Sequence, residues 1–375
     1  DTAVRLTGEE LAQRGATDLA SALALLPDVS VRAVGRGGVN IDIRGARKGS
    51  VRVLIDGVSV SDPYYGTFDI STIPITDIVQ IRVSTTALSP IDGPGGPGGV
   101  IEVHTRDAIG TQLVLARLTV DTLPSATWSG GARAKLAPGW GLRVSATGNA
   151  GVREFTLPAL PSDSDAARSV AEGRRAATFA LRLEHRDNDR SDGTDDARLH
   201  RARRRMVLDL AADDRRYLSP PSETNVGSLL LIDRETTLRG GVAIEQQVGR
   251  WQAIGRAWTQ RLQRRSRNFR DAALTDQAQL EDLQAWRVGG QALVTRPLGR
   301  QHRFALATVL DHERASALDA QGQATAGTST VLEVAANGQT QTATTKLDAA
   351  LGVAVPFGIG ANASSPWLDA KLVGR

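Results

Sequence analysis

The chain of 375 residues carries 45 basic and 41 acidic residues, for a formal net charge of +4, and 41% of its residues are hydrophobic. This length and apolar content suffice for two domains with buried cores, and the near balance of charge gives no indication of nucleic-acid binding. The absence of cysteine excludes disulfides, a thiol nucleophile and a cysteine metal site. No stretch approaches the roughly 20 apolar residues of a spanning helix, so any membrane crossing would have to use β-strands.

Two short helices are expected first. Residues 7–10, TGEE, form a capping-box sequence, in which the threonine hydroxyl and the last glutamate carboxylate accept hydrogen bonds from free amides at a helix start. This motif predicts a helix that ends near Gly15. A second helix should begin at Thr17 and end before Pro27, which cannot continue it. Its apolar residues share one face: Leu19, Ala22, Leu23 and Leu26.

A β-hairpin is expected at residues 51–61. Residues 51–55, VRVLI, are mostly apolar, and residues 58–61, VSVS, return in alternation. Asp56 and Gly57 between them suit the two left-handed positions of a tight primed turn. Two further strands would complete an α+β domain at residues 1–106: Ile78–Val83 and Val100–Thr105.

Residues 107–375 have a different texture, in which apolar and polar residues alternate in stretches of about ten. Phe179, Leu181 and Leu183 should share one face, opposite Ala180, Arg182 and Glu184. The expected strands are Leu113–Thr119, Ala126–Leu136, Gly141–Asn149, Ala177–His185, Met206–Ala212, Thr236–Gln247, Trp251–Gln260, Trp286–Thr295, His302–Asp311, Thr330–Ala336, Thr342–Val353 and Trp367–Val373.

Long polar connections separate some of these strands. They are expected at residues 158–175, 186–205, 219–229 and 268–282. A meander with long loops on one side and short turns on the other is typical of a transmembrane β-barrel. The sequence therefore predicts an α+β domain followed by an antiparallel β-meander of such a barrel.

The motifs of residues 4–108 closely resemble, in order, those of the plug domain of TonB-dependent outer-membrane receptors. They are LTGEELAQRGATDLASALALLPDVSV, IDIRG, LIDGVSV, IPITDIVQIRV and GGVIEVHT. The chain departs from the family pattern at Arg82, where an acidic residue is usual, and at Asp28, where glycine is usual. The resemblance implies a plug domain at residues 1–106 and the N-terminal part of the receptor barrel, with long polar loops, at residues 107–375.

The resemblance also assigns residues. Six positions would form the structural signature of the plug, serving turn or packing geometry rather than a ligand site: Arg44, Gly45, Asp56, Gly57, Gly98 and Gly99. Four N-terminal residues look like the segment that a periplasmic energy-transducing TonB-type protein grips by strand addition: Asp1, Thr2, Ala3 and Val4. The alternative is that these four belong to the first strand of the plug.

The length of the chain bears on the barrel. The 22-stranded barrel of the family needs about 9–11 residues per strand plus connections, and residues 107–375 offer roughly 12 per strand in total. The visible loops already use much of that length. We therefore expect the barrel to be incomplete and the chain to be the N-terminal part of a longer receptor.

Other motifs give weaker indications. The glycine-rich residues 93–99 lack the Lys-Ser/Thr of a phosphate loop, and five histidines show no metal or catalytic spacing. Acidic residues 187–196 miss the EF-hand spacing, so a solvated loop is expected, with weak calcium binding as the alternative. The basic run 198–205 could meet lipopolysaccharide phosphates, lie at a membrane interface or form a plain charged loop; it lacks the aromatic residues of a nucleic-acid site.

The resemblance implies a function: gated, energy-dependent uptake across the cell outer membrane. The ligand would be a scarce small molecule of the siderophore, cobalamin, haem or oligosaccharide class, and the sequence does not identify its binding residues. A TonB-type protein and outer-membrane lipid would be the partners, with no nucleic acid, cofactor, metal or catalytic residue. Two alternatives are an outer-membrane interaction or adhesion protein of the same fold that transports nothing, and a soluble periplasmic binding module.

Overall fold

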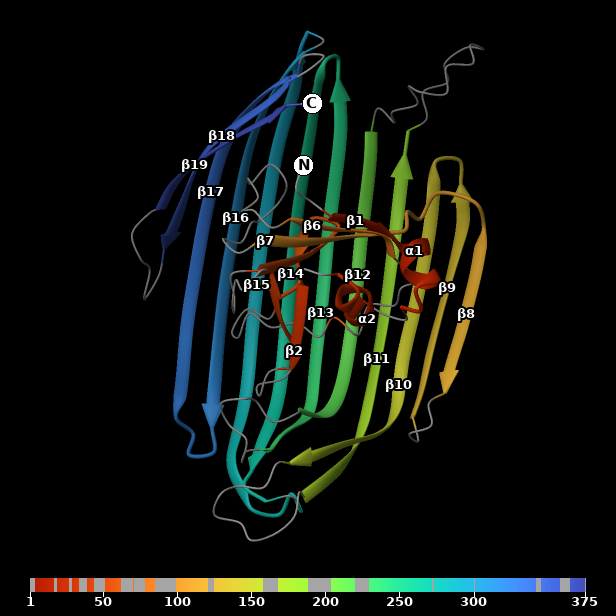
Figure 1. Ribbon diagram of the computed structural model, residues 1–375, viewed down its shortest axis with the longest axis vertical. Coiled ribbons are helices and arrows are strands. Elements are labelled where there is room, and N and C mark those ends of the chain that lie inside the picture. The colour runs from red at the N-terminus through yellow and green to blue at the C-terminus, as the bar shows by residue number, and fades with distance from the viewer. Residues whose placement is uncertain are drawn as a thin grey trace.

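The computed structural model describes residues 4–16, 19–26, 29–33, 39–43, 51–61, 70, 78–84, 99–120, 125–157, 168–187, 204–219, 229–271, 273–299, 301–341, 345–357 and 365–374. These residues form two parts. An N-terminal domain of short strands and helices ends at Thr105, and a sheet of long strands begins at Leu113. Figure 1 shows the N-terminal domain, in red and orange, lying against one face of the long sheet.

Two helices stand near the start of the N-terminal domain: α1 (Gly8–Gln13) and α2 (Leu19–Ala24). The predicted capping box is present, because the Glu10 amide donates to the Thr7 hydroxyl at 3.2 Å and the Thr7 amide donates to the Glu10 carboxylate at 2.8 Å. The apolar stripe of α2 is buried as predicted. Among the described residues, no helix combines the length and apolar character needed to cross a membrane.

The strands of the N-terminal domain form two sheets within the described residues. Five strands run in the order β1-β6-β7-β4-β5, and β2 pairs with β3 separately. The predicted hairpin is confirmed, with Asp56 and Gly57 at φ values of 51° and 84°. The strand bounds are β1 (Val4–Thr7), β2 (Val29–Ala33), β3 (Val39–Ile43), β4 (Val51–Ile55), β5 (Val58–Ser59), β6 (Ile78–Ser84) and β7 (Gly99–Thr105).

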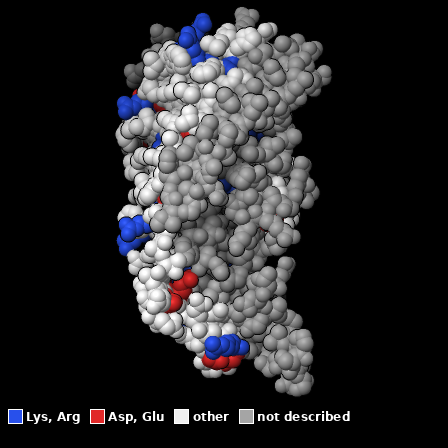
Figure 2. Space-filling view, turned by 90° about the vertical axis from the view of Figure 1, so that its left-hand side faces the viewer, with Lys and Arg blue, Asp and Glu red and all other residues white. Residues whose placement is uncertain are grey.

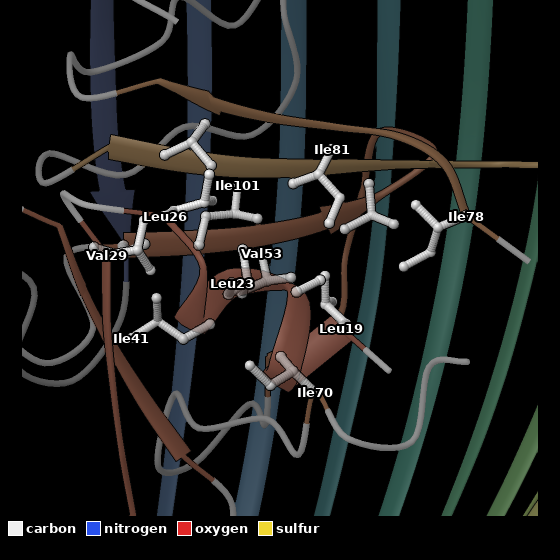
Figure 3. Packing of buried hydrophobic residues seen from close by; sticks show 14 of the residues in the cluster. Leu19, Leu23, Leu26, Val29, Ile41, Val53, Ile70, Ile78, Ile81 and Ile101 are labelled. Atoms are coloured by element: carbon white, nitrogen blue, oxygen red, sulfur yellow. The ribbon is translucent and has the colours of Figure 1, made fainter. Parts of the chain in front are cut away.

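An apolar core holds these elements together. Side chains from α2 and from the strands of both sheets converge on it, as Figure 3 shows for Leu23, Ile41, Val53, Ile81 and Ile101. Leu23 and Ile101 are completely buried. Burial of this kind stabilises a domain by about 25 cal/mol per Å² of apolar surface. The N-terminal domain is therefore built like an ordinary water-soluble domain.

The second part is an antiparallel meander of 12 strands within the described residues, each paired with its neighbours in sequence. Every strand predicted for residues 107–375 has a counterpart. Their bounds are β8 (Leu113–Val120), β9 (Ser125–Ala137), β10 (Trp140–Leu157), β11 (Arg168–Arg186), β12 (Arg204–Ser219), β13 (Leu229–Val248), β14 (Trp251–Phe269), β15 (Gln277–Leu298), β16 (His302–Asp319), β17 (Ala324–Gln341), β18 (Thr345–Phe357) and β19 (Ser365–Gly374).

Most strands are longer than predicted. β11 begins at Arg168 and β15 begins at Gln277, inside segments that were expected to be loops. The ladder continues there, as the pairing of Leu157 with Arg168 shows. At the start of β11, residues 168–175 read RSVAEGRR, which lacks the apolar-polar alternation that marks a half-buried strand although backbone pairing persists.

The two ends of the meander differ. Short turns join β9 to β10, β13 to β14 and β15 to β16, and we call this the short-turn end. Residues 158–167, 220–228 and 270–276 connect strands at the opposite end, which we call the long-loop end. Residues 187–203, which join β11 to β12, are a long connection at the short-turn end. The prediction that the long connections share one side is therefore wrong for this one.

The long sheet places apolar side chains outward. The outward Phe179 and Leu306 are 49% and 45% exposed, whereas Arg182 and Glu184, which face the N-terminal domain, are 4% and 0% exposed. The predicted alternation is confirmed, and the buried face is the polar one. The side view in Figure 2 shows only scattered charged residues among those described on that side of the molecule.

Candidate functional site at the contact between the two parts

Asp56 is the centre of the first contact. It occupies the turn between β4 and β5, and its carboxylate accepts hydrogen bonds from the amide and hydroxyl of Thr105 at 2.9 and 2.6 Å. Arg182 of β11 donates to the same carboxylate at 2.5 Å and to Asp209 of β12 at 2.6 Å. The turn thereby joins the N-terminal domain to two strands of the long sheet.

The charge on Asp56 is maintained by these partners. Burial opposes ionisation, but the Arg182 guanidinium and the hydrogen bonds from Thr105 outweigh it, so the pKa of Asp56 lies below its usual range. Gly57 allows the close approach, because a Cβ there would lie 2.6 Å from the Nη1 of Arg256. The turn residues thus serve the contact between the two parts as well as the hairpin.

A second contact fixes the segment that leaves the N-terminal domain. The fully buried Glu184 of β11 accepts hydrogen bonds from the amides of Ala108 and Ile109 at 2.9 and 3.3 Å. Arg186 and Arg205 donate to the same carboxylate at 2.6 and 2.7 Å. Both arginines also pair with Asp107, at 3.3 and 2.7 Å. The chain is therefore anchored to β11 and β12 just before β8 begins.

A third contact holds the β4–β5 hairpin from the other side. Arg287 of β15, which is 2% exposed, donates to the Ser61 carbonyl at 2.7 Å and to the Ser59 hydroxyl at 3.4 Å. It also pairs with Glu313 and with Asp311, the latter at 3.5 Å. Arg52 of β4 lies 3.9 Å from Asp311. The contact between the two parts is thus made of charged and polar groups.

A cavity of about 380 Å³ lies between the hairpin and the inner face of β10–β14. Its lining is mixed in charge, with carboxylates from the N-terminal domain and several arginines from the sheet. Apolar side chains such as Ile55, Val207 and Trp258 also line it, so the cavity presents both polar and apolar surface. Its polar lining includes Asp56, Glu102, His104, Arg182 and Arg256.

Glu102 and His104 form a titratable pair beside this cavity. His104 Nε2 lies 3.5 Å from the Glu102 carboxylate, and Arg82 of the neighbouring strand also lies 3.5 Å from it. The hydrogen bond to Glu102 raises the pKa of His104 despite partial burial. Burial opposes ionisation of Glu102, but His104 and the Arg82 and Arg256 charges hold the pKa of Glu102 below its usual range. Arg82, the departure from the family pattern, therefore pairs with Glu102.

The remaining residues predicted for the plug signature and for the contact with the energy-transducing protein are described only in part. Gly99 has a φ of 115°, and a Cβ there would lie 2.4 Å from the Ser84 carbonyl oxygen, so glycine is required. Val4 begins β1 and pairs with Val83. Six predicted residues lie outside the described part of the chain: Asp1, Thr2, Ala3, Arg44, Gly45 and Gly98.

The structure describes only part of the acidic segment, residues 187–196, and of the basic run, residues 198–205, so it tests the predictions for them only in part. The proposed calcium loop lies outside the described residues except for Asp187, which contacts His185 at 2.7 Å. Among the described residues, no cluster of three or more potential metal ligands occurs. Arg205, at the end of the basic run, points to the inner face and pairs with Glu184, Asp107 and Glu245. A lipid-phosphate contact is therefore wrong for Arg205.

Sequence reasoning missed the partners on the long sheet. Arg182 and Glu184 were assigned to one face of their strand, yet nothing local indicated that Asp56, 126 positions away, meets Arg182. The sequence feature that could have indicated these partners is the pattern of β11, in which charged residues alternate with large apolar residues. A charged inner face requires a polar partner, and a conspicuous Asp-Gly turn was a candidate.

Comparison with known proteins identifies the N-terminal domain. Residues 2–100 match the model of the TonB-dependent receptor plug domain. The chain is similar to the vitamin B12 transporter BtuB of Photobacterium profundum, with 31% identity over 101 residues, which are 27% of this chain and 17% of that protein. The chain thus spans only a small part of this curated relative.

Solved structures extend the similarity to the whole chain. A ferric enterobactin receptor, PfeA, from Pseudomonas aeruginosa matches 98% of this chain and 59% of its own, with a TM-score of 0.73 and 15% identity. The ferric yersiniabactin uptake receptor FyuA from Yersinia pestis matches 100% and 61%, with a TM-score of 0.66 and 14% identity. At these identities the match shows the fold, a plug domain against part of a receptor barrel. Residues 2–100 therefore match a TonB-dependent receptor plug domain, and the chain as a whole has the fold of such a plug lying against part of a receptor barrel.

Proposed function

We propose that this chain acts within a gated receptor that takes up a scarce ligand across the outer membrane, using energy from a periplasmic TonB-type protein. One observation carries the proposal: a soluble-type plug domain is held against the polar inner face of an outwardly apolar sheet by the Asp56, Glu184 and Arg287 contacts. A plug in that place obstructs passage, and a polar contact can be rearranged with water as a substitute partner.

The outer face supports location in a membrane. On β14, Trp251 and Arg261 are both outward and ten positions apart; on β15, Trp286 and Arg296 have the same spacing. The neighbouring strands also carry two polar or charged outward residues ten positions apart. On β11–β16, the outward residues between the two members of each pair are Ala, Val, Leu, Ile, Met, Phe, Gly or Thr.

This spacing fits a bilayer. Ten strand residues extend about 33 Å, and a strand tilt of about 40° reduces that to a height of about 25 Å. An apolar band of about 25 Å flanked by aromatic residues is the outer surface of a bacterial outer-membrane barrel. The band favours the membrane receptor over a soluble periplasmic module, which would leave this apolar surface in water.

The strand order of the plug offers a route for applied force. β1 is an edge strand, and it pairs through β6 and β7 with β4, which ends at Ile55, directly before Asp56. A TonB-type protein that binds residues preceding or within β1 would apply force first to the paired strands β1, β6, β7 and β4. The force would then reach the contact between Asp56 and Arg182. Gating would then consist of separating the plug from the sheet at its charged contacts.

The ligand class is proposed from the relatives. BtuB is named for vitamin B12, and the two solved receptors are named for ferric enterobactin and ferric yersiniabactin. We therefore propose a scarce ligand of the cobalamin or siderophore class, with haem and oligosaccharides as the other classes to be screened.

The first experiment is fractionation followed by uptake. The complete gene product should be recovered in the outer membrane, and cells that lack other receptors should accumulate at least one of three labelled probes: vitamin B12, ferric enterobactin or ferric yersiniabactin. A protonophore should abolish that uptake. Outer-membrane recovery without energy-dependent uptake of any probe in a broadened panel would instead favour an interaction or adhesion protein.

The gate itself can be tested by reversing a charge pair. Asp56→Arg places two arginines together and should increase entry of a large hydrophilic antibiotic that the intact outer membrane excludes. The double variant Asp56→Arg/Arg182→Asp restores opposite charges and should reduce that entry again. Asp271→Asn, which alters an exposed carboxylate in the β14–β15 connection, is the matched control and should leave entry unchanged. Equal entry in all variants would contradict the gating role of this contact.

A further inference from the structure

Trp258 of β14 lies in a row of inward residues that is symmetrical about it. Its cross-strand partners are two glycines, Gly241 on β13 and Gly289 on β15. An aspartate follows on the next strand in each direction: Asp209 of β12 pairs with Gly241, and Asp311 of β16 pairs with Gly289. The indole therefore has the same two neighbours, first a glycine and then an aspartate, in both directions across the inner face of the sheet.

The indole occupies the Gly289 side in this structure. A Cβ on Gly289 would overlap the atoms of the Trp258 ring, so glycine is required there. On the other side, the described atom nearest to a Cβ on Gly241 is the Ala257 carbonyl oxygen, at 3.7 Å. Gly241 has no left-handed φ, and the pairing register is continuous through it. In this conformation, neither a turn, a bulge nor a close contact with the described residues requires glycine at position 241.

The cavity lies on the Gly241 side of Trp258. Its described lining includes Asp209, Gly241 and Trp258, but neither Gly289 nor Asp311. With a volume of about 380 Å³ it can hold an indole, since a cavity of about 150 Å³ accommodates a benzene ring. Glycine within a strand often marks a site where another group comes close to the backbone. Gly241 and the cavity thus provide a second position for a planar ring, equivalent to the one that Gly289 provides.

The plug hairpin lies across this row. The turn residue Gly57 packs against Arg256, which is two positions from Trp258 toward the short-turn end. Ser59 contacts Arg287, which lies one row from Trp258 toward the long-loop end. Trp258 lies between these two contacts and is 3% exposed. The hairpin therefore covers Trp258 from the plug side.

Asp209 connects the second ring position to the plug contact. Its carboxylate accepts hydrogen bonds from Arg182 at 2.6 and 2.9 Å, and the same guanidinium donates to Asp56. The Asp209 side chain is 39% exposed and lines the cavity. An indole on Gly241 would place its N–H beside this carboxylate and compete with Arg182 for it, so Arg182 would be oriented less firmly toward Asp56. Because such coupling is reciprocal, separation of Asp56 from Arg182 would favour the indole on Gly241.

We propose that Trp258 is a two-position switch at the contact between the plug and the sheet. Its indole lies on Gly289 while Asp56 is bound to Arg182, and it moves onto Gly241 when the hairpin separates from the sheet. The movement needs only a change of side-chain rotamer, and two χ1 values are common in strands. The inference deepens the proposed function and rests on it, because it names a residue that favours the separated state of the plug.

The test is fluorine NMR of the complete receptor in detergent, with fluorotryptophan in place of tryptophan and the Trp258 resonance assigned from Trp258→Phe. The unmodified receptor should give one Trp258 resonance, and Asp56→Arg, which separates the hairpin, should give a second. Adding Gly241→Ala should abolish the second resonance, because the alanine Cβ would occupy the surface that receives the ring. Gly240→Ala, at the outward neighbour, is the matched control and should retain it, since its Cβ would make an ordinary contact with Leu210 at 3.5 Å.

Gly289→Ala tests the switch from the other side. Its Cβ would overlap the present ring position, so the Trp258 resonance should move toward the second one even when Asp56 is intact. Entry of the large hydrophilic antibiotic should rise about fivefold or more, which is the low end of typical coupling between two sites. Gly255→Ala, whose Cβ would have open space around it, is the control and should leave both readouts unchanged.

Two results would overturn the proposal. One is the absence of a second resonance in Asp56→Arg, or its equal persistence with Gly241→Ala and with Gly240→Ala. The other is unchanged antibiotic entry in Gly289→Ala although the Trp258 resonance has moved. Gly241→Ala introduces no overlap in this structure, so the first result can be obtained even if Gly289→Ala is not recovered from the outer membrane.

The uptake assay distinguishes failure of this inference from failure of the proposed function, because the NMR measurement needs no transported ligand. A receptor that takes up its probe without the Gly241-dependent resonance contradicts the switch alone. A receptor that shows this resonance but takes up no probe contradicts the proposed function alone.

Discussion

The plug domain and the long sheet place their apolar side chains on opposite sides. In the plug, Leu23 and Ile101 are completely buried at the centre. In the sheet, Phe179 and Leu210 are 49% and 48% exposed on the outer surface, while Glu235 and Arg264 are buried on the inner face. The same alternation of residue types therefore has opposite meanings in the two regions, because one region folds in water and the other is suited to lipid.

The inner face of the sheet is stabilised by networks of charge. Glu235 of β13 lies between Arg215 of β12 and Arg264 of β14, and all three side chains are at most 5% exposed. Arg264 donates to the Glu235 carboxylate at 2.5 Å. Buried ions of this kind depend on their partners, since removing one partner by mutation leaves an uncompensated buried charge.

Removing the central carboxylate should have the largest effect. Glu235→Leu leaves two arginines buried together and should lower the free energy of unfolding by about 3–5 kcal/mol. Denaturant unfolding of the complete receptor in detergent measures this loss. Asp282→Leu is the matched control on the outer face, where an exposed pair contributes about 0–1 kcal/mol. Similar losses for the two variants would show that the inner network is not specially dependent on its charges.

Leucine truncations test the apolar half of the comparison. Leu23→Ala opens a cavity in the plug core and should cost about 2–5 kcal/mol. Leu210→Ala removes the same atoms from the outer face, where detergent or lipid fills the space, so its cost should be about 1 kcal/mol or less. Thermal unfolding followed separately by plug and barrel probes compares them. An equal cost would mean that Leu210 packs against protein rather than lipid.

The smallest effect concerns pH. The pKa of His104 is raised by Glu102, so its contribution to stability is complete below about pH 6.5 and is lost as pH rises through the folded-state value. An NMR titration should show His104 titrating above the usual value, and Glu102→Gln should lower its pKa. Unchanged titration of His104 in Glu102→Gln would rule out the pairing.

Local sequence patterns predicted the elements well. The Asp56-Gly57 turn, the capping box at Thr7 and the strands of the meander all depend on neighbours in sequence, and each was confirmed. Strand length was underestimated, because polar extensions such as the start of β11 carry no apolar alternation. Backbone pairing decides whether those residues form a strand, and it does not depend on the type of side chain.

The contacts between the plug and the long sheet could not be predicted from the sequence. Asp56 was interpreted as a turn residue, which it is, but its contact with Arg182 depends on how the plug lies against the sheet. Glu184 likewise binds the amides of Ala108 and Ile109 from a distant strand. Such pairs have no spacing rule, since any carboxylate could meet any arginine across an interface.

The anchoring of Ala108 and Ile109 by Glu184 sets a pivot for the plug. Because these amides are held to β11, any movement of the plug is confined to the residues that precede Ala108. The part of the plug farthest from Ala108 would move most, while the segment that leaves the plug stays in place. A displaced plug would therefore stay attached beside β11 and return to its original position on the sheet. If the proposed gating occurs in cycles, each cycle would then end with the plug in its original register, without a search for the correct position.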